Sequence, residues 1–199
     1  MKKPKKKLPI YTMSINEDGD SSVNYVALVD SPATERNWFA FSKQMKFKVD
    51  AKRRIITGAL MVADLPIYRV GESGDEYYVV FPAAEIEKIA QKFFRQKNTS
   101  NVNMMHDPTK QVDGVYMFES FIIDEKRGIK VPDGFTGITE GSWFGSYKVD
   151  NNEVWKSVLD GTFQGYSVEG MFDMEIQDVS IEQEIVDMID DIAKIIKGQ

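Results

Sequence analysis

Short runs of strand-forming residues, separated by turn residues, are the feature that most constrains the fold of this chain. Examples are the apolar or alternating runs at residues 24–30, 54–62, 115–123 and 165–176. Such runs, bounded by Gly, Pro, Asn or Asp, are typical of β-strands. Strands therefore outnumber helices in the predicted structure.

Two internal helices interrupt these runs. Residues 83–97 have apolar positions at helical spacing, and so does the shorter segment 153–159, which Asp150–Asn152 can cap. The elements do not alternate as regular βαβ units. The sequence therefore predicts an α+β fold: a small, roughly seven-stranded, mostly antiparallel β-barrel or strongly curved sheet with peripheral helices.

The 199 residues suit one domain with terminal extensions. Residues 1–22, basic and then acidic, are expected to be a flexible tail, and residues 23–178 the folded domain. Residues 179–199 are expected to form an acidic amphipathic helix with an isoleucine-rich stripe. We expect this helix to pack against the domain or against a second copy of itself.

Composition excludes several kinds of site. The chain has no cysteine and a single histidine, so it has no disulfide, no thiolate nucleophile and no multi-histidine metal site. No EF-hand spacing is present, and we expect neither a metal nor a cofactor. The net charge of -6 argues against nucleic-acid binding by the fold, although the Lys2–Lys7 cluster is basic. We expect no membrane span, because no long apolar run occurs.

The single histidine, His106, and a serine near the start of the last predicted strand, Ser167, are the candidates for catalysis. A serine hydroxyl becomes a good nucleophile when a neighbouring base removes its proton, and histidine is the usual base. Gly165 and Gly170 flank Ser167, which allows a substrate backbone to approach closely. No G-x-S-x-G elbow is present.

Three carboxylates are candidates for orienting His106. Glu169 is favoured because residues two apart in a strand share a face, so an imidazole can bridge Ser167 and Glu169. Glu119 is the rival, but a hairpin with its turn near residues 110–111 pairs His106 with Val115 and leaves Glu119 ~13 Å away. Asp30, at the end of the first predicted strand, stays open.

Several motifs resemble those of tailed-phage prohead proteases, the capsid-maturation serine proteases, in their XkdF-like branch. Asn103–Asp107 with Val112–Val115 resembles the histidine motif, and Gly165–Gly170 resembles the serine motif. Further matching segments are Ala27–Ala33, Gly58–Met61, Asp64–Tyr68, Glu119–Asp124, Trp143, Lys148–Val149 and Val154–Trp155. The resemblance covers roughly residues 24 to 176.

The resemblance implies a barrel related to the herpesvirus assemblin protease, with Ser167 and His106 on neighbouring strands. It also implies that the protein cleaves scaffold and major capsid protein segments inside the prohead, in the host cytoplasm, as a homodimer or larger assembly. The third catalytic residue does not carry over. Herpesvirus relatives use a second histidine, and Tyr25 stands where other phage branches place an acid.

Two other functions stay open. One is a catalytically inactive structural or scaffolding virion protein that keeps the fold and docks through its terminal helix. The other is a capsid component that contacts nucleic acid through Lys2–Lys7. Labelling of Ser167 by a fluorophosphonate distinguishes the enzyme from both.

Overall fold

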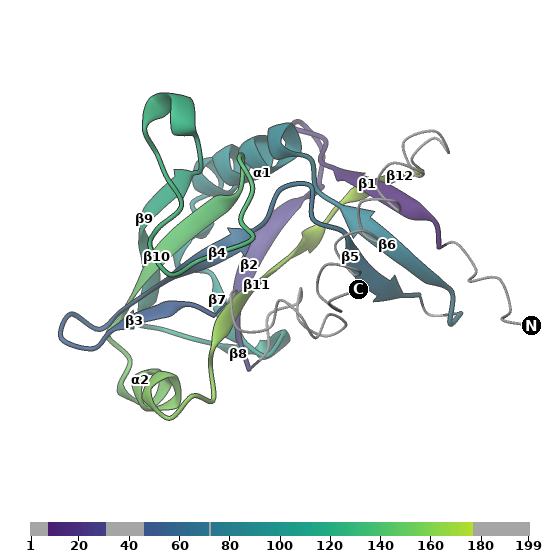
Figure 1. The fold of residues 1–199 in the computed structure, drawn as a ribbon. Coiled ribbons are helices and arrows are strands. Elements are labelled where there is room, and N and C mark those ends of the chain that lie inside the picture. Colours follow the sequence, from purple (N-terminus) through teal and green to yellow (C-terminus); the bar gives the residue numbers. More distant parts are fainter. Residues whose placement is uncertain (1–7, 31–45, 72, 177–199) are drawn as a thin grey trace, which may run out of the picture.

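The computed structural model describes residues 8–30, 46–71 and 73–176. Figure 1 shows the arrangement of their helices and strands. In chain order the elements are β1 (Ile10–Ser14), β2 (Ser22–Val29), β3 (Lys48–Asp50), β4 (Ile55–Met61), β5 (Ile67–Val70), β6 (Glu76–Val80), α1 (Ala83–Arg95), β7 (Val102–Met104), β8 (Asp107–Gln111), β9 (Val115–Ile122), β10 (Trp143–Val149), α2 (Asn152–Leu159), β11 (Gly165–Met171) and β12 (Asp173–Ile176).

These strands form three four-stranded sheets, ordered β12-β1-β6-β5, β3-β4-β10-β9 and β11-β2-β7-β8. The first and third are mixed because β1–β6 and β2–β7 pair in parallel. The predicted α+β class is confirmed. The predicted seven-stranded barrel is wrong for the described residues, whose strands form separate sheets without closing. Closure depends on pairing between distant strands, which a local residue pattern does not encode.

One main core joins the three sheets to α1 and α2. Its largest fully buried side chains are Trp143, Tyr147 and Phe93, and the rings of Phe93 and Trp143 meet edge-on at 5.4 Å. Burying one large apolar side chain contributes about 1.5–3 kcal/mol to folding. The two helices therefore hold the sheets in place from outside, as the sequence predicts.

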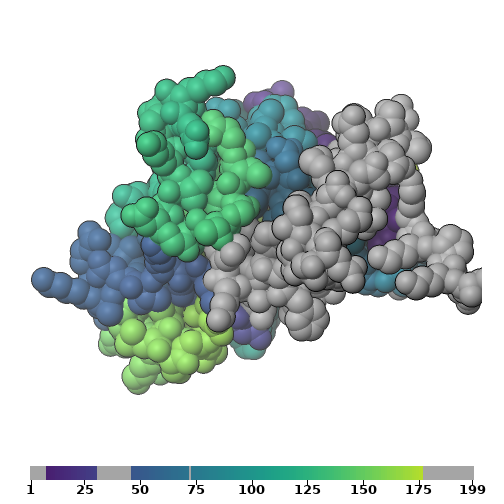
Figure 2. Space-filling model, in the orientation of Figure 1, coloured from purple at the N-terminus to yellow at the C-terminus, as the bar shows by residue number. Residues whose placement is uncertain are grey.

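The helix α2 lies beside the β3–β4 turn, as the lower part of the space-filling view shows (Figure 2). Its N-cap is Asn151, whose side-chain oxygen accepts hydrogen bonds from the backbone N–H groups of Glu153 and Val154. The Arg54 guanidinium lies over the Trp155 ring and donates to the Asn152 side chain at 3.0 Å. These contacts fix the helix that immediately precedes β11.

Two predictions about the ends of the folded region need correction. The strand β1 lies within residues 1–22, so that segment is not a tail throughout, and the buried Lys92 ammonium donates to three backbone carbonyls of the β1–β2 loop. The predicted single strand 165–176 breaks at Phe172, which packs edge-on against Phe81, so β11 and β12 join different sheets. The predicted helix at 179–199 lies outside the described residues.

Candidate functional site

The sheet β11-β2-β7-β8 has one apolar and one polar face, set by strand alternation. Tyr166, Leu28 and Val102 belong to the main core. In the same strands, Ser167 pairs with Ala27, which pairs with Asn103. These three side chains therefore point away from the main core, in one row across the sheet. The polar face carries the candidate serine.

The position of Ser167 depends on its neighbour Tyr166, whose side chain lies on the opposite face of the sheet. The Tyr166 hydroxyl donates to the Ile56 carbonyl oxygen at 2.7 Å, which ties β11 to β4. Ser167 itself is only 4% exposed, and its hydroxyl forms no hydrogen bond with any residue in the described ranges. The hydroxyl therefore lies on a strand that is tied to β4 and forms no structural hydrogen bond in the described ranges.

His106 lies in a two-residue turn between β7 and β8. Met104 pairs with Asp107, so Met105 and His106 form the turn, and both have positive φ, 55° and 59°. A type I′ turn requires this geometry, which non-glycine residues adopt only at a cost of about 1 kcal/mol or more each. The predicted hairpin, with its turn near residues 110–111, is wrong. The turn was missed because it lacks the usual Asn-Gly or Asp-Gly pair.

This turn brings the His106 ring to Glu169. Nδ1 of His106 lies 3.0 Å from Oε1 of Glu169, with the imidazole 41% and the carboxylate side chain 26% exposed. Oε1 itself is buried and has no hydrogen-bond partner of standard geometry among the described residues. A proton on Nδ1 places a donor beside this oxygen, although the two atoms form no hydrogen bond of standard geometry. That tautomer leaves Nε2 free to accept a proton.

Glu169 and Ser167 therefore share a face of β11, and His106 meets Glu169 on that face. In the sheet order, β2 separates β11, which carries Ser167, from β7, which leads into the turn with His106. The resemblance implies neighbouring strands for the serine and the histidine, and the structure differs from it in this respect. Ala27 on β2 is the sheet partner of Ser167, and its small side chain is fully buried. The structure therefore shows a contact between the carboxylate and the imidazole, with Ser167 on the same face of β11 and no hydrogen bond between Ser167 and His106 in the described ranges.

A comparison with known protein families shows which family the chain belongs to. Residues 43–175 match the family described as "Putative phage serine protease XkdF". The chain belongs to this family. The match spans more than half of the chain and includes His106, Ser167 and Glu169, whereas β1 and β2 precede it. No curated protein and no solved structure shows significant similarity to the chain.

Other acidic residues near the site of this XkdF-family protein have different partners. The Asp107 carboxylate accepts from the Thr109 hydroxyl and backbone N–H and contacts Lys110 Nζ at 3.0 Å. Hydrogen bonds from the Thr109 hydroxyl, which has the larger effect, and from Lys110 lower the pKa of Asp107 to about 2. Asp107 therefore stabilises the strand after the turn and does not orient His106. Asp30, which directly follows β2, forms no hydrogen bond or ion pair with His106.

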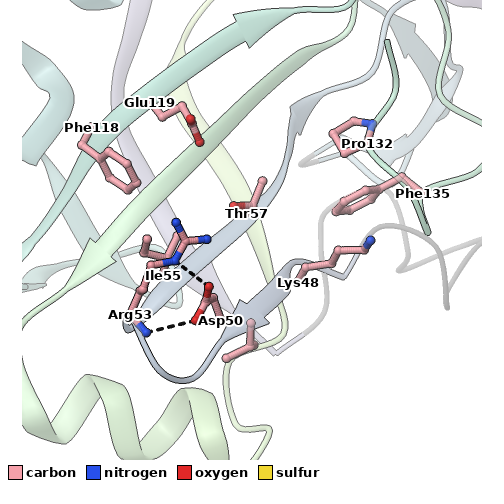
Figure 3. Close-up of a pocket in the computed structure, with 10 residues that line it drawn as sticks. Lys48, Asp50, Arg53, Ile55, Thr57, Phe118, Glu119, Pro132 and Phe135 are labelled. Atoms are coloured by element: carbon pink, nitrogen blue, oxygen red, sulfur yellow. Dashed lines mark hydrogen bonds and ion pairs between the residues drawn. The ribbon is translucent and has the colours of Figure 1, made fainter.

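Glu119, the rival for orienting the histidine, belongs to another sheet. It lies on β9, and its Oε2 accepts a hydrogen bond from the Ser146 hydroxyl at 2.6 Å. It also lines an open pocket of about 400 Å³, where Thr57, Phe118 and Phe135 face the same space (Figure 3). The pocket contains neither His106 nor Ser167. Glu119 is therefore not part of the candidate site.

The described residues show neither a cluster of metal-binding side chains nor a helix that could span a membrane. They contain no group of three or more acidic or histidine side chains that could hold a metal ion. In the same ranges, no helix is long and apolar enough to cross a membrane. Asn103, for which the sequence alone indicates no role, lies in the same row across the sheet as Ser167. Its position three residues before His106 was the only available signal.

Gly170 allows β11 to pass close to β2 directly after Glu169. A Cβ atom at this position would lie 2.0 Å from the Ser22 carbonyl oxygen, so the backbone would have to move. We expect Gly170→Ala to lower the free energy of unfolding by about 3 kcal/mol or more. Urea denaturation measures this change. The control is Gly71→Ala, whose new Cβ would have no atom closer than 3.6 Å, and equal stability of the two variants would contradict the prediction.

Proposed function

We propose that this protein is a serine endopeptidase that cleaves scaffold and major capsid protein segments during assembly of the phage prohead. Membership of a phage serine protease family supports the reaction class. The observation that carries the proposal is the contact between His106 and Glu169 on the sheet face that bears Ser167. The substrates and the location inside the prohead follow from the resemblance to capsid-maturation proteases.

Each of the three side chains has one role in the proposed mechanism. Ser167 Oγ attacks the carbonyl carbon of the scissile peptide bond while His106 Nε2 takes the hydroxyl proton. The imidazolium then gives this proton to the leaving amine, and an acyl-enzyme forms. His106 next removes a proton from water, and the resulting attack releases the acid and restores Ser167. Glu169 holds the proton on Nδ1 and stabilises the imidazolium.

The missing hydrogen bond between Ser167 and His106 is compatible with this mechanism. Catalytic hydrogen bonds are often long without substrate and tighten when substrate binds. The same observation is the one that favours the second candidate function, an inactive structural or scaffolding virion protein. The two functions differ in whether the folded protein cleaves anything.

The test is incubation of the purified protein with the scaffold and major capsid proteins of its phage. The enzyme predicts discrete cleavage products with wild-type protein and none with Ser167→Ala. A structural protein predicts co-sedimentation with the scaffold and no cleavage. Products that persist unchanged with Ser167→Ala would contradict the proposed site.

A further inference from the structure

Asn103 on β7 is the most unusual polar residue of the described chain. It is fully buried, and neither its Nδ2 nor its Oδ1 has a hydrogen-bond partner in the described ranges. A buried amide without partners is destabilising, because it has lost its bonds to water without replacing them. Unsatisfied groups of this kind require an explanation, and a role toward a ligand is one.

The neighbours of Asn103 explain why its amide is unpaired. On one side its partner in the sheet is Ala27, which has no polar side-chain atom. On the other side its partner is Gln111, whose Nε2 donates to the Tyr25 hydroxyl at 2.9 Å and thereby points elsewhere. A serine or threonine at position 27 would offer a partner, but alanine leaves the amide free.

Asn103 lies in the same row across the sheet as Ala27 and Ser167. Cross-strand partners point to the same face, so Asn103 and Ser167 stand on either side of the small Ala27 side chain. Their Cα atoms are two strand spacings apart, about 10 Å. Four parts placed end to end span this separation. They are the serine side chain, one acyl carbonyl group, one hydrogen bond of about 2.9 Å and the asparagine side chain.

We propose that the Asn103 side-chain amide donates a hydrogen bond to the oxyanion that forms when Ser167 attacks a peptide carbonyl. This inference rests on the proposed protease function and adds a catalytic residue to it. In the tetrahedral intermediate the carbonyl carbon is bonded to Ser167 Oγ, the oxygen carries the negative charge, and the proton is on His106. The oxygen points over Ala27 toward Asn103. A donor already in place there stabilises the charge without reorganisation.

A structural role for Asn103 predicts different behaviour. If the amide only served the fold, for example through a bound water, its loss would lower stability and leave the turnover of folded protein unchanged. If the amide is an oxyanion donor, it is unpaired in the substrate-free protein and lowers the stability of that state. Its replacement by the nearly isosteric leucine should then leave the melting temperature equal or higher and lower the turnover.

The experiment compares wild type, Asn103→Leu and Asn101→Leu with a peptide substrate taken from a mapped cleavage site. We expect Asn103→Leu to lower kcat about 10²–10³-fold with little change in KM, as the loss of one oxyanion donor does in other serine proteases. Asn101 is the control because its Nδ2 is already used, donating to the Asn24 carbonyl oxygen at 3.1 Å. Asn101→Leu should lower the melting temperature and keep kcat.

A peptide aldehyde of the same sequence gives the second readout. Ser167 adds to its carbonyl carbon, and the resulting hemiacetal oxygen mimics the oxyanion. Asn103→Leu should weaken aldehyde inhibition by the same factor as kcat, and should leave inhibition by the cleaved product peptide unchanged. Asn103→Leu protein with a wild-type kcat, or with aldehyde and product weakened equally, would overturn the assignment.

Failure of this inference and failure of the proposed function give different results. A wild type that neither cleaves the peptide nor reacts with a fluorophosphonate at Ser167 would overturn both. A wild type that does both, with an Asn103→Leu variant that matches it, would overturn only the role of Asn103.

Discussion

Replacement of Ser167 or of His106 by alanine should each lower kcat by about 10⁶-fold, to the level of any uncatalysed background. Ser167 supplies the atom that attacks, and His106 is the single histidine of the chain, so no second imidazole can replace it as base. The double variant should be no worse than either single variant, because the two residues act as one unit. Discontinuous assays of peptide cleavage over long incubations measure these rates.

The control for these variants is Ser157→Ala. The Ser157 hydroxyl lies on α2 and donates to the Glu153 carbonyl oxygen at 3.3 Å, away from the polar face of the sheet. This variant should keep wild-type activity. Far-UV circular dichroism and melting temperature should show that all the variants are folded. Activity losses of the two single variants that multiply in the double variant would contradict a coupled pair.

Glu169→Gln should lower kcat by about 10⁴-fold with little change in KM. Glutamine keeps the size of the side chain but removes the charge that stabilises the imidazolium, and its amide N–H₂ can face Nδ1 and favour the wrong tautomer. The measurement is steady-state kinetics on the folded variant. The expected effect is smaller than that of Ser167→Ala, because the nucleophile and the base both remain.

Glu119→Gln is the matched control for Glu169→Gln. The Glu119 carboxylate accepts from Ser146 on another sheet, and a glutamine side-chain oxygen can keep that hydrogen bond. Its activity should stay within a few-fold of wild type. If Glu119→Gln were the more damaging substitution, the histidine would be oriented by an acid other than the one that contacts it.

Local patterns predicted the elements of this fold much better than their partners. The alternation in β9 and β10 and the helical spacing in α1 gave these elements nearly their observed bounds. The parallel pairing of β2 with β7 joins residues far apart in the chain, for example Val26 and Val102. A period of two or of 3.6 residues says which face is buried but not which strand lies beside it.

In the candidate site, too, local features could be predicted from the sequence and contacts between distant segments could not. Ser167 and Glu169 share a strand, so their common face could be predicted from their spacing alone. The contact of His106 with Glu169 depends on a turn at Met105–His106 with two consecutive positive φ values, which are uncommon for methionine and more frequent for histidine. The unpaired amide of Asn103 depends on what Ala27 and Gln111 do beside it. Such features appear only when the strands are assembled.

Reaction with a fluorophosphonate probe measures directly whether Ser167 is a nucleophile activated by His106. Labelled protein is digested and the modified peptide is identified by mass spectrometry. We predict that wild-type protein is labelled at Ser167, that His106→Ala is labelled far more slowly, and that Ser167→Ala is not labelled. A wild-type protein that cleaves its substrate while Ser167 stays unlabelled and another serine carries the probe would contradict the account.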